Sequence, residues 1–485
     1  MAEKKETSKE DKGITVKKED DMPEWYTQVV QKAGLADFYA PVKGFMIIKP
    51  YGYAVWEKIQ AYFNSRIKKY GVKNAYFPLL IPEKFFKKEA EHAKGFAPEL
   101  AWIEKTEEGE KLAIRPTSET IMYDSYSRWI RSYRDLPLKI NQWCNVLRWE
   151  VKQTKLFLRS REFLWQEGHC VYETEEECVK EALLYLEEYK KLSEDLLAIP
   201  VLIGEKTEKE RFAGAKNTYT IEALMPDGKA LQMGTSHNLG QNFAKSFNIK
   251  FLGRDEKTHT PWQSSWGFST RLIGAVVMVH GDNNGLVLLP KIAPVQVVIV
   301  PIFYEKDKKE ILDKCKELKK ILSLKFDVEL DDREEYTPGW KFNEWELKGV
   351  PIRLELGPKD LDKGQVVLVR RDTGEKTTAK LSNNLQKEIQ KLLGDIEMNL
   401  FSKAQKFLKE STVEVSTWKE FLKAIKEKKL VKAPFCGKIE CEDWIKDKTA
   451  GANSRLIPLD AKKPKGKCVH CGKEAKVIAY FSKSY

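Results

Sequence analysis

Arginines and carboxylates are concentrated in short stretches of apolar sequence in the first half of the chain. Arg148 and Glu150 stand two residues apart in LRWEV, so a strand here would place both side chains on one face. Arg271 follows later, in WGFSTR. Planar guanidiniums bind pairs of phosphate oxygens, and the chain has no glycine-rich phosphate loop, so side chains would have to hold a nucleotide. We therefore predict a phosphate-handling site centred on these three residues.

Further polar and aromatic side chains lie in four short segments, IRPTSET, LRSREFLWQEGH, LQMGTSHN and WGFST. In the second segment Trp165, Glu167 and His169 alternate, so a strand would present them on one face. Arg161 and Glu162 are equally well explained as structural ion-pair partners, and Trp165 alone as a core residue. The other candidate side chains are those of Arg115, Thr117, Glu119, Arg159, Ser160, Phe163, Gln232, Thr235, His237 and Ser269.

Four cysteines form two close pairs near the end of the chain. Four residues separate Cys436 from Cys441, and two separate Cys468 from Cys471. Such pairs, brought together across a loop, are typical of a structural tetrahedral zinc site. His470 could replace one ligand, and four ordinary reduced thiols are the alternative. The remaining cysteines are predicted to be core thiols: Cys144, Cys170, Cys178 and Cys315.

The composition favours an intracellular protein of several domains. Hydrophobic residues make up 42% of the chain, which excludes a disordered protein. With 485 residues, the chain is too long for one ordinary core. The first 21 residues carry six Lys and seven acidic residues and predict a disordered tail, not a signal peptide. No apolar run approaches the roughly 18 residues of a membrane helix. We therefore expect a cytoplasmic protein with no membrane partner.

Most of the net charge of +12 lies in residues 401–485, where nineteen Lys and one Arg stand against ten acidic residues, a net of +10. This excess predicts a face that binds a polyanion such as nucleic acid. A solvated lysine-rich surface explains it about as well.

Two helices and a hairpin are predicted to position the candidate side chains. Apolar residues recur every three or four positions over 54–71, which predicts a helix leading into an extended segment at 75–83. Thr174 and Glu177 form a capping box that begins a second helix. An antiparallel hairpin is predicted from strands at 141–151 and 160–172.

Three blocks follow the tail. Residues 23–289 mix helices and strands, whereas 290–394 alternates strand, helix and strand, which predicts a small α/β domain with some parallel pairing. Residues 395–485 hold a helical stretch and then the cysteine pairs.

The motifs, in this order, resemble those of the class II aminoacyl-tRNA synthetases. The first helix with FPLLIP, the LRWE…REF strand pair and WGFSTR resemble motifs one, two and three of that class. RPTSET, FLWQEGH and GTSH resemble the prolyl-tRNA synthetases of the archaeal and eukaryotic type. The resemblance covers nearly the whole chain after the tail, and the order and spacing of the motifs together are highly specific.

The resemblance implies an α/β multidomain protein and, through the motif-one helix and strand, a homodimer. A disordered tail at 1–22 would precede an antiparallel catalytic sheet flanked by helices at 23–289. An α/β anticodon-binding domain would follow at 290–394, and a zinc-binding domain at 395–485.

The resemblance also implies roles in ATP binding. Arg148 would hold the α-phosphate of ATP and the amino-acid carboxylate, and Arg271 would clamp the nucleotide from the other side. The attacking carboxylate is already ionised at neutral pH, so positioning and charge neutralisation suffice for catalysis without a general base. Arg159 would bind the distal phosphates and Phe163 would stack on adenine. The other implied ATP contacts are Glu150, Ser160, Gln232 and Thr235, and Gln232 would also bind Mg²⁺.

Proline as the substrate explains a carboxylate at Glu119. A cyclic secondary ammonium offers two N–H donors and a positive charge, which Thr117 and Glu119 could accept together. Trp165, Glu167 and His169 would shape the pocket for the ring. The remaining implied proline contacts are Arg148, His237 and Ser269.

Two other functions are considered. A synthetase for threonine would hold zinc in its amino-acid pocket, but Cys144 and Cys170 have no matching histidine pair. A non-catalytic paralogue that only binds tRNA would have lost the arginines and Glu119, which are present. We expect L-proline and tRNA(Pro) as partners and no editing domain, since only about sixty residues separate motif two from Gln232. The resemblance also implies that the C-terminus can reach the active site, where Tyr485 would make a regulatory or stabilising contact. A frayed chain end is the alternative.

Overall fold

A computed structural model describes residues 13–88, 100–103, 109–149, 154–462, 464 and 466–485. Glu150, a predicted ATP contact, lies outside the described residues. The chain forms two compact units. Unit 1 contains residues 1–37, 47–58 and 276–403, and unit 2 contains 38–46, 59–275 and 404–485. The expected catalytic block at 23–289 is therefore divided between the two units.

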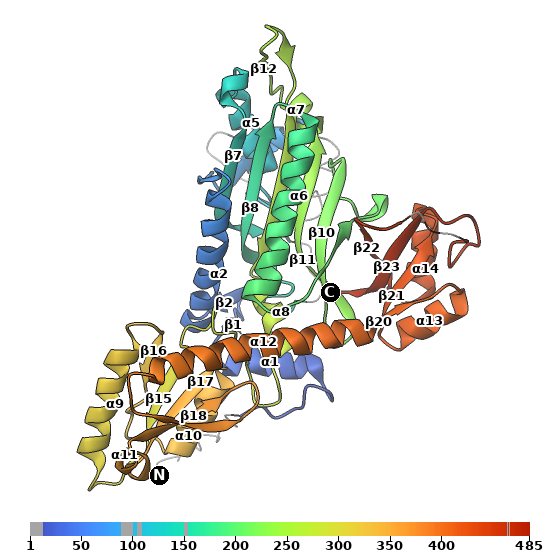
Figure 1. Cartoon of the computed structure of the whole chain (residues 1–485). Coiled ribbons are helices and arrows are strands. Elements are labelled where there is room, and N and C mark those ends of the chain that lie inside the picture. Colours follow the sequence, from blue (N-terminus) through green and yellow to red (C-terminus); the bar gives the residue numbers. More distant parts are fainter. Residues whose placement is uncertain (1–12, 89–99, 104–108, 150–153, 463, 465) are drawn as a thin grey trace, which may run out of the picture. The chain divides into compact units, whose positions relative to one another are not determined.

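Unit 2 is built on an eleven-stranded sheet, which Figure 1 shows with its central strands upright. Strands β9, β10, β11, β14, β8 and β7 pair antiparallel, as expected for a class II catalytic sheet. In spatial order the strands are β20 (Thr412–Glu414), β21 (Leu430–Phe435), β23 (Val477–Ser484), β22 (Asn453–Pro458), β9 (Leu202–Glu205), β10 (Asn217–Leu224), β11 (Lys229–Gly240), β14 (Trp262–Ser269), β8 (Glu162–Tyr172), β7 (Leu138–Leu147) and β3 (Lys73–Asn74).

The predicted hairpin is confirmed as β7 and β8, which pair from Leu138↔Val171 to Leu147↔Glu162. Arg148 lies one residue beyond the end of β7, not within the strand as predicted. Its backbone N–H still donates to the Arg161 carbonyl oxygen at 2.8 Å, so the ladder fixes its position.

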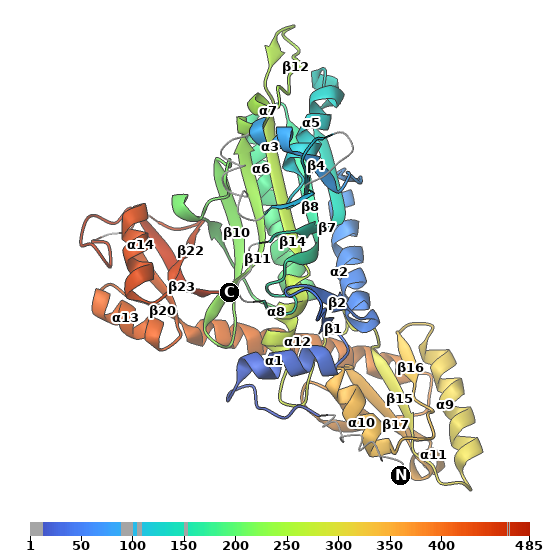
Figure 2. The same ribbon diagram turned by 180° about the vertical axis from the view of Figure 1, so that it is seen from behind.

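The two faces of this sheet carry different layers. Helix α6 (Glu175–Lys191) crosses one face, and its predicted capping box is confirmed, since the Glu177 N–H donates to Thr174 Oγ1 at 3.2 Å. Figure 2 shows the other face, where α3 and β4 lie in front of the sheet. Tyr123 and Tyr126 of α5 belong to a core that also contains Phe77. The elements near this core are α3 (Glu83–Lys88), α5 (Glu119–Trp129), α7 (Asn242–Ser246), the small sheet β4 (Leu80–Pro82), β6 (Leu112–Ile114) and β5 (Ala101–Ile103), and the pair β12 (Phe251–Leu252) and β13 (Thr258–His259).

The C-terminal part of the chain joins the same sheet. Strands β20 to β23 surround a core that includes Phe421, Phe435 and Phe481, covered by α13 (Trp418–Lys426) and α14 (Ile439–Lys448). β22 pairs with β9 through Ile457↔Glu205 and continues the catalytic sheet. Residues 404–485 of the predicted third block therefore belong to unit 2 through this shared sheet, although they enclose a hydrophobic core of their own.

Unit 1 contains the predicted α/β domain, a five-stranded sheet in the order β16-β15-β17-β18-β19. β15 pairs parallel with both β16 and β17, which confirms the expected parallel pairing. The elements are β15 (Val297–Pro301), α9 (Lys308–Leu322), β16 (Val328–Leu330), α10 (Pro338–Leu347), β17 (Ile352–Leu356), α11 (Pro358–Asp362), β18 (Gln365–Arg370) and β19 (Lys376–Lys380).

Several elements do not respect the boundaries expected from the sequence. Helix α12 (Leu385–Ser411) runs straight through the expected boundary at 394/395. The predicted helix at 54–71 is α2 and begins earlier, at Pro50, and ends at Lys68. In the described residues no helix is both long and apolar enough to cross a membrane. Besides α2, α12 and the α/β domain, the elements with one or both ends in unit 1 are α1 (Met22–Lys32), β1 (Ala36–Phe38), β2 (Met46–Ile48) and α8 (Arg271–His280).

The expected disordered tail, residues 1–22, differs from the structure in its last part. The Lys18 backbone N–H donates to Asn283 Oδ1 at 2.7 Å, and Lys18 Nζ donates to the Gly281 carbonyl oxygen at 2.6 Å. Thr15 also donates to Gln28 Oε1, from its backbone N–H at 2.9 Å. These contacts fix residues after position 13 against unit 1, which the charge-rich composition did not predict.

Candidate active site

The predicted site residues surround two adjoining cavities in unit 2. One, of about 230 Å³, is lined by all the predicted proline contacts. The other, of about 200 Å³, shares Arg148, Phe163, Ser269 and Arg271 with the first. The first cavity is also lined by Gln232 and Thr235, and the second by Arg159 and Ser160. The two cavities thus bring together all the described residues predicted to bind proline or ATP, whereas the candidates Arg115, Arg161 and Glu162 line neither cavity.

Strand register creates the first cavity. Trp165, Glu167 and His169 alternate along β8, as predicted, and line one side of it. On β14 the residue opposite His169 is Ser265, which in turn lies opposite His237 on β11. Because side chains at paired positions point to the same face, segments almost 70 residues apart in sequence meet in one row.

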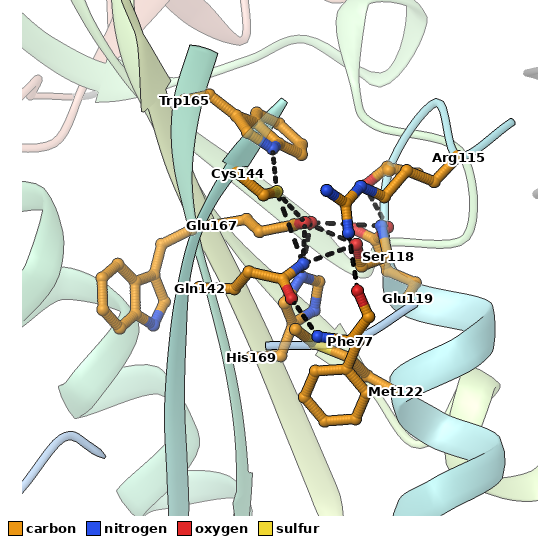
Figure 3. Close-up of polar contacts among 12 residues, drawn as sticks. Phe77, Arg115, Ser118, Glu119, Met122, Gln142, Cys144, Trp165, Glu167 and His169 are labelled. Atoms are coloured by element: carbon orange, nitrogen blue, oxygen red, sulfur yellow. Dashed lines mark hydrogen bonds and ion pairs between the residues drawn. The ribbon is translucent and has the colours of Figure 1, made fainter. Parts of the chain in front are cut away.

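Glu167 is the most heavily hydrogen-bonded carboxylate of the cavity (Figure 3). It accepts from the Ser118 N–H at 3.1 Å and hydroxyl at 2.5 Å, and from Gln142 Nε2 at 3.0 Å. His169 Nε2 lies 3.0 Å from Glu167 Oε2, and the Cys144 thiol donates to Oε1 at 3.3 Å. Glu167 is only 2% exposed, so these donors replace the water that an ionised carboxylate requires.

Glu119 begins α5 and faces the same cavity, where the Thr117 hydroxyl donates to it. Glu119 is 3% exposed. With Glu167 it gives this end of the cavity two buried carboxylates, which suit a cationic group of the ligand.

The two histidines of the row have opposite protonation tendencies. Burial opposes a charge on His169, but the hydrogen bond to Glu167 and the charge of Glu119 outweigh it and raise the His169 pKa above its ordinary value. The same pairing outweighs burial at Glu167 and lowers its pKa. Burial, followed by the charge of His169, lowers the pKa of His237 to about 3. His237 is therefore a neutral wall of the cavity, with Nδ1 3.0 Å from the Thr218 hydroxyl.

Arg271 and Arg148 form the positive end. Burial, followed by the charge of Arg148, lowers the pKa of Arg271 to about 10. Within the described part of the chain, the Arg271 guanidinium donates only to the backbone carbonyls of Leu158 and Gln232, each at 3.3 Å, and it forms no salt bridge there. Arg148 lies over the rings of Phe163 and Trp165, with 5.5 Å to each centroid. Two neighbouring cations held this way favour a polyanionic ligand.

Tyr485 closes one side of the second cavity. Its hydroxyl donates to Asp227 Oδ2 at 2.6 Å, and its backbone N–H donates to the Ala230 carbonyl oxygen at 3.3 Å. Lys155 and Lys229 lie over its ring, 5.3 and 4.8 Å from the centroid. The weak prediction of a contact near the active site is therefore supported by position.

The four paired cysteines converge. Their sulfur atoms, those of Cys436, Cys441, Cys468 and Cys471, all lie within 4.8 Å of one another. The pKa of Cys468 is lowered through its hydrogen bond with Cys441, whose own pKa is raised, so one thiol already favours the thiolate form. This donor set fits a tetrahedral Zn²⁺ site. His470 Nδ1 lies 3.1 Å from Cys441 Sγ, which keeps the alternative ligand close.

Comparisons with known proteins agree with this arrangement. Residues 102–280 match the family model of the tRNA synthetase class II core domain (G, H, P, S and T), and 296–392 match the anticodon binding domain. Residues 418–485 match the C-terminal domain of prolyl-tRNA synthetases. A "Proline--tRNA ligase" of Alkaliphilus oremlandii is 54% identical over 469 residues, 96% of each chain. The chain belongs to the prolyl-tRNA synthetase family.

Other members of the prolyl-tRNA synthetase family give the same result. A "Proline--tRNA ligase" of Natranaerobius thermophilus is 54% identical over 95% of each chain, and a "Proline--tRNA ligase 2" of Clostridioides difficile is 52% identical over 97% of each. The similarity extends through all three matched domains. It confirms the family and the class II fold that the motifs of the sequence predicted.

The structure also reveals site residues that the sequence did not indicate. Ser118 and Gln142 hold Glu167, and the Tyr123 hydroxyl lies 3.1 Å from His169 Nδ1. Only the capping position of Ser118 before α5 could have drawn attention to one of them. Further cavity-lining residues outside the prediction are Glu210, Phe212, Thr218, Met233, Gly234, Ser265, Trp266, Gly267 and Phe268.

One expectation about metal ligands needs correction. The first block was expected to lack a ligand set, because its cysteines had no matching histidine pair. Glu119, Glu167 and His169 nevertheless offer ligand atoms within 4.8 Å of one another. The His169–Glu167 hydrogen bond and the Thr117–Glu119 hydrogen bond already use several of these atoms. Glu119 lies 48 residues before Glu167 in the chain, so no local spacing in the sequence indicated this cluster.

Proposed function

We propose that this chain activates L-proline with ATP and transfers the prolyl group to tRNA(Pro), with the two cavities of unit 2 as the reaction site. One observation carries the assignment of roles. The cavity has two buried carboxylates at one end and two arginines at the other. Proline carries an ammonium and a carboxylate, and the second cavity next to the arginines provides room for a nucleotide.

Glu119 and Thr117 bind the two N–H groups of the proline ammonium. Trp165, His169 and His237 enclose the ring, and neutral His237 adds no charge beside its methylene groups. Arg148 binds the proline carboxylate and so aims it at the second cavity. The proposed proline contacts are completed by Glu167 and Ser269.

The α-phosphate of ATP lies between Arg148 and Arg271. A carboxylate oxygen of proline attacks the α-phosphorus in line, and the bond to pyrophosphate breaks. The arginines neutralise the charge on the phosphate oxygens, and no proton is transferred in this step. Arg159 binds the distal phosphates, Phe163 stacks on adenine, and Glu150, Ser160 and Thr235 contact ATP. Gln232 would also hold Mg²⁺, which would neutralise further phosphate charge.

The second step transfers proline to tRNA. A hydroxyl of the terminal ribose attacks the prolyl carbonyl and AMP leaves. The domain within 290–394 binds the anticodon, and the domain at 395–485 holds structural Zn²⁺ through Cys436, Cys441, Cys468 and Cys471. We also propose a homodimer through the region of α2, and a cytoplasmic location, where charged tRNA is used by ribosomes.

The test is ATP–pyrophosphate exchange with each of the twenty amino acids and Mg²⁺. Proline should support exchange well above all others. Exchange with threonine instead would favour the other synthetase, and no exchange with any amino acid would favour a tRNA-binding paralogue. Glu119→Gln should raise the KM for proline about tenfold to a hundredfold, because a charge-assisted hydrogen bond is lost. Glu181→Gln, on α6 beside Lys139, is the matched control and should leave the KM unchanged.

A further inference from the structure

A short loop at the edge of the proline cavity is attached to the C-terminal domain. Residues 206–212, here called the pocket-edge loop, contribute Glu210 and Phe212 to the cavity lining. The Phe212 ring lies against His237, with 4.6 Å between ring centroids. The Phe212 N–H donates at 3.0 Å to the Thr218 hydroxyl, which lies 3.0 Å from His237 Nδ1. The position of this loop therefore determines the cavity wall around His237.

Glu442 of helix α14 holds the start of the pocket-edge loop. The Thr207 hydroxyl donates to one Glu442 oxygen at 2.9 Å, and the Ser454 hydroxyl donates to the other. Glu442 is 1% exposed and Thr207 4%. Among the described residues no salt bridge to Glu442 forms, so this buried carboxylate depends on the two hydroxyls for its solvation. Thr207 is also the residue from which the short helical turn 208–210 begins.

The rest of the loop is fixed from β22. Asn453 Nδ2 donates to Glu210 Oε1 at 3.1 Å. Lys206 Nζ donates to Glu222 Oε1 at 2.5 Å and to the Arg455 carbonyl oxygen at 2.8 Å, and Arg455 donates to Glu222 Oε2 at 2.8 Å. The loop is therefore attached to the C-terminal domain at Lys206, Thr207 and Glu210, whereas its last residue, Phe212, is held by Thr218.

Glu442 directly follows Cys441, and both lie in the first turn of α14. We propose that Glu442 is a positioning residue that couples the cysteine cluster to the amino-acid site. A metal bound by the four cysteines fixes the start of α14, Glu442 then holds Thr207, and the pocket-edge loop keeps Phe212 against His237. This coupling rests on the proposed function, because it assigns the first cavity to the amino acid.

The kinetic test compares two glutamates on either side of Cys441. Glu442→Ala should raise the KM for proline about tenfold, from loss of the hydrogen bonds to a charged acceptor, with kcat and the KM for ATP changed less than about twofold. Glu440→Ala is the matched control, since Glu440 is exposed and contacts nothing in the loop. Thr207→Val should reproduce the effect, and Glu442→Gln should restore most of the wild-type KM. Thr207→Val removes one hydroxyl only, and it carries the test if Glu442→Ala does not fold.

A second measurement does not depend on activity. Amide hydrogen exchange in residues 206–212 should accelerate in Glu442→Ala and in wild-type protein after metal removal with a chelator, but not in Glu440→Ala. Chelation should accelerate amide exchange of residues 206–212 little further in Glu442→Ala, because the hydrogen bond between Glu442 and Thr207 is already absent. Unchanged KM for proline in both Glu442→Ala and Thr207→Val, or unchanged exchange of the loop after chelation, overturns the coupling. If the wild-type protein shows no proline-dependent exchange of pyrophosphate, the proposed function fails instead.

Discussion

Replacing Arg271 by methionine should leave the free protein at least as stable as wild type while removing most of its activity. Burial, followed by the charge of Arg148, lowers the pKa of Arg271 from its ordinary value to about 10. At about 1.4 kcal/mol for each pKa unit, the folded protein gives up roughly 3 kcal/mol to keep this guanidinium charged. The side chain is partly exposed to the cavity, so solvent reduces this cost.

Methionine keeps most of the side-chain volume and removes the charge. Two hydrogen bonds to the carbonyls of Leu158 and Gln232 are lost, each about 1 kcal/mol at their length of 3.3 Å. The free energy of unfolding should therefore stay the same or rise by about 1 kcal/mol. Pyrophosphate exchange should fall about a hundredfold to a thousandfold, because a preorganised cation at the transferring phosphate is gone.

Arg115→Met is the matched control. Arg115 is also buried, but its guanidinium donates to the carbonyl oxygens of Asn145 and Phe77 at 2.9 and 2.8 Å and to Asn145 Oδ1 at 3.1 Å. Its loss leaves buried acceptors without donors, so the free energy of unfolding should fall by about 3 kcal/mol. Urea denaturation followed by circular dichroism gives both values, and the rise in Tm with Mg-ATP reports nucleotide binding.

The free energy of unfolding should thus fall in Arg115→Met and should not fall in Arg271→Met. Mg-ATP should raise the Tm of wild type but not that of Arg271→Met. If Arg271→Met is destabilised as much as Arg115→Met, Arg271 is a structural residue. Exchange within tenfold of the wild-type rate would also refute the reasoning.

Two further predictions concern the buried pair and the cysteines. His169 has a raised pKa and Glu167 a lowered one, so the pair's contribution to stability is fullest between the unfolded pKa values, about 4.3 for Glu and 6.5 for His. Urea titrations of wild type and His169→Gln give the difference in their free energies of unfolding at each pH. This difference should shrink as pH rises through the folded pKa of His169, and also as pH falls through that of Glu167. A difference that stays constant from pH 3 to 9 would contradict the pairing. Cys468→Ser should lose about one zinc per chain in metal analysis and should have a lower Tm. Cys315 is a buried thiol in α9, so Cys315→Ser is the control and should retain the zinc of the wild-type protein. A full zinc content in Cys468→Ser would disprove the Cys₄ site.

Local sequence determined the parts of the site that depend on one element. Alternation in FLWQEGH placed Trp165, Glu167 and His169 on one face of β8, and Thr174 with Glu177 fixed the start of α6, because strand period and capping are set by neighbours in the chain. The cysteine spacings likewise predicted a cluster that the structure forms.

The tertiary structure decided what depends on distant partners. The pairing of β22 with β9 joins the C-terminal domain to the catalytic sheet, and no local pattern in either strand specifies that partner. Register across β8, β14 and β11 put Ser265 between His169 and His237, and the pocket-edge loop entered the cavity through contacts with Thr218 and Glu442. The protonation tendencies of His169, His237 and Arg271 followed from the same packing, since burial and neighbouring charges, not residue type, set them.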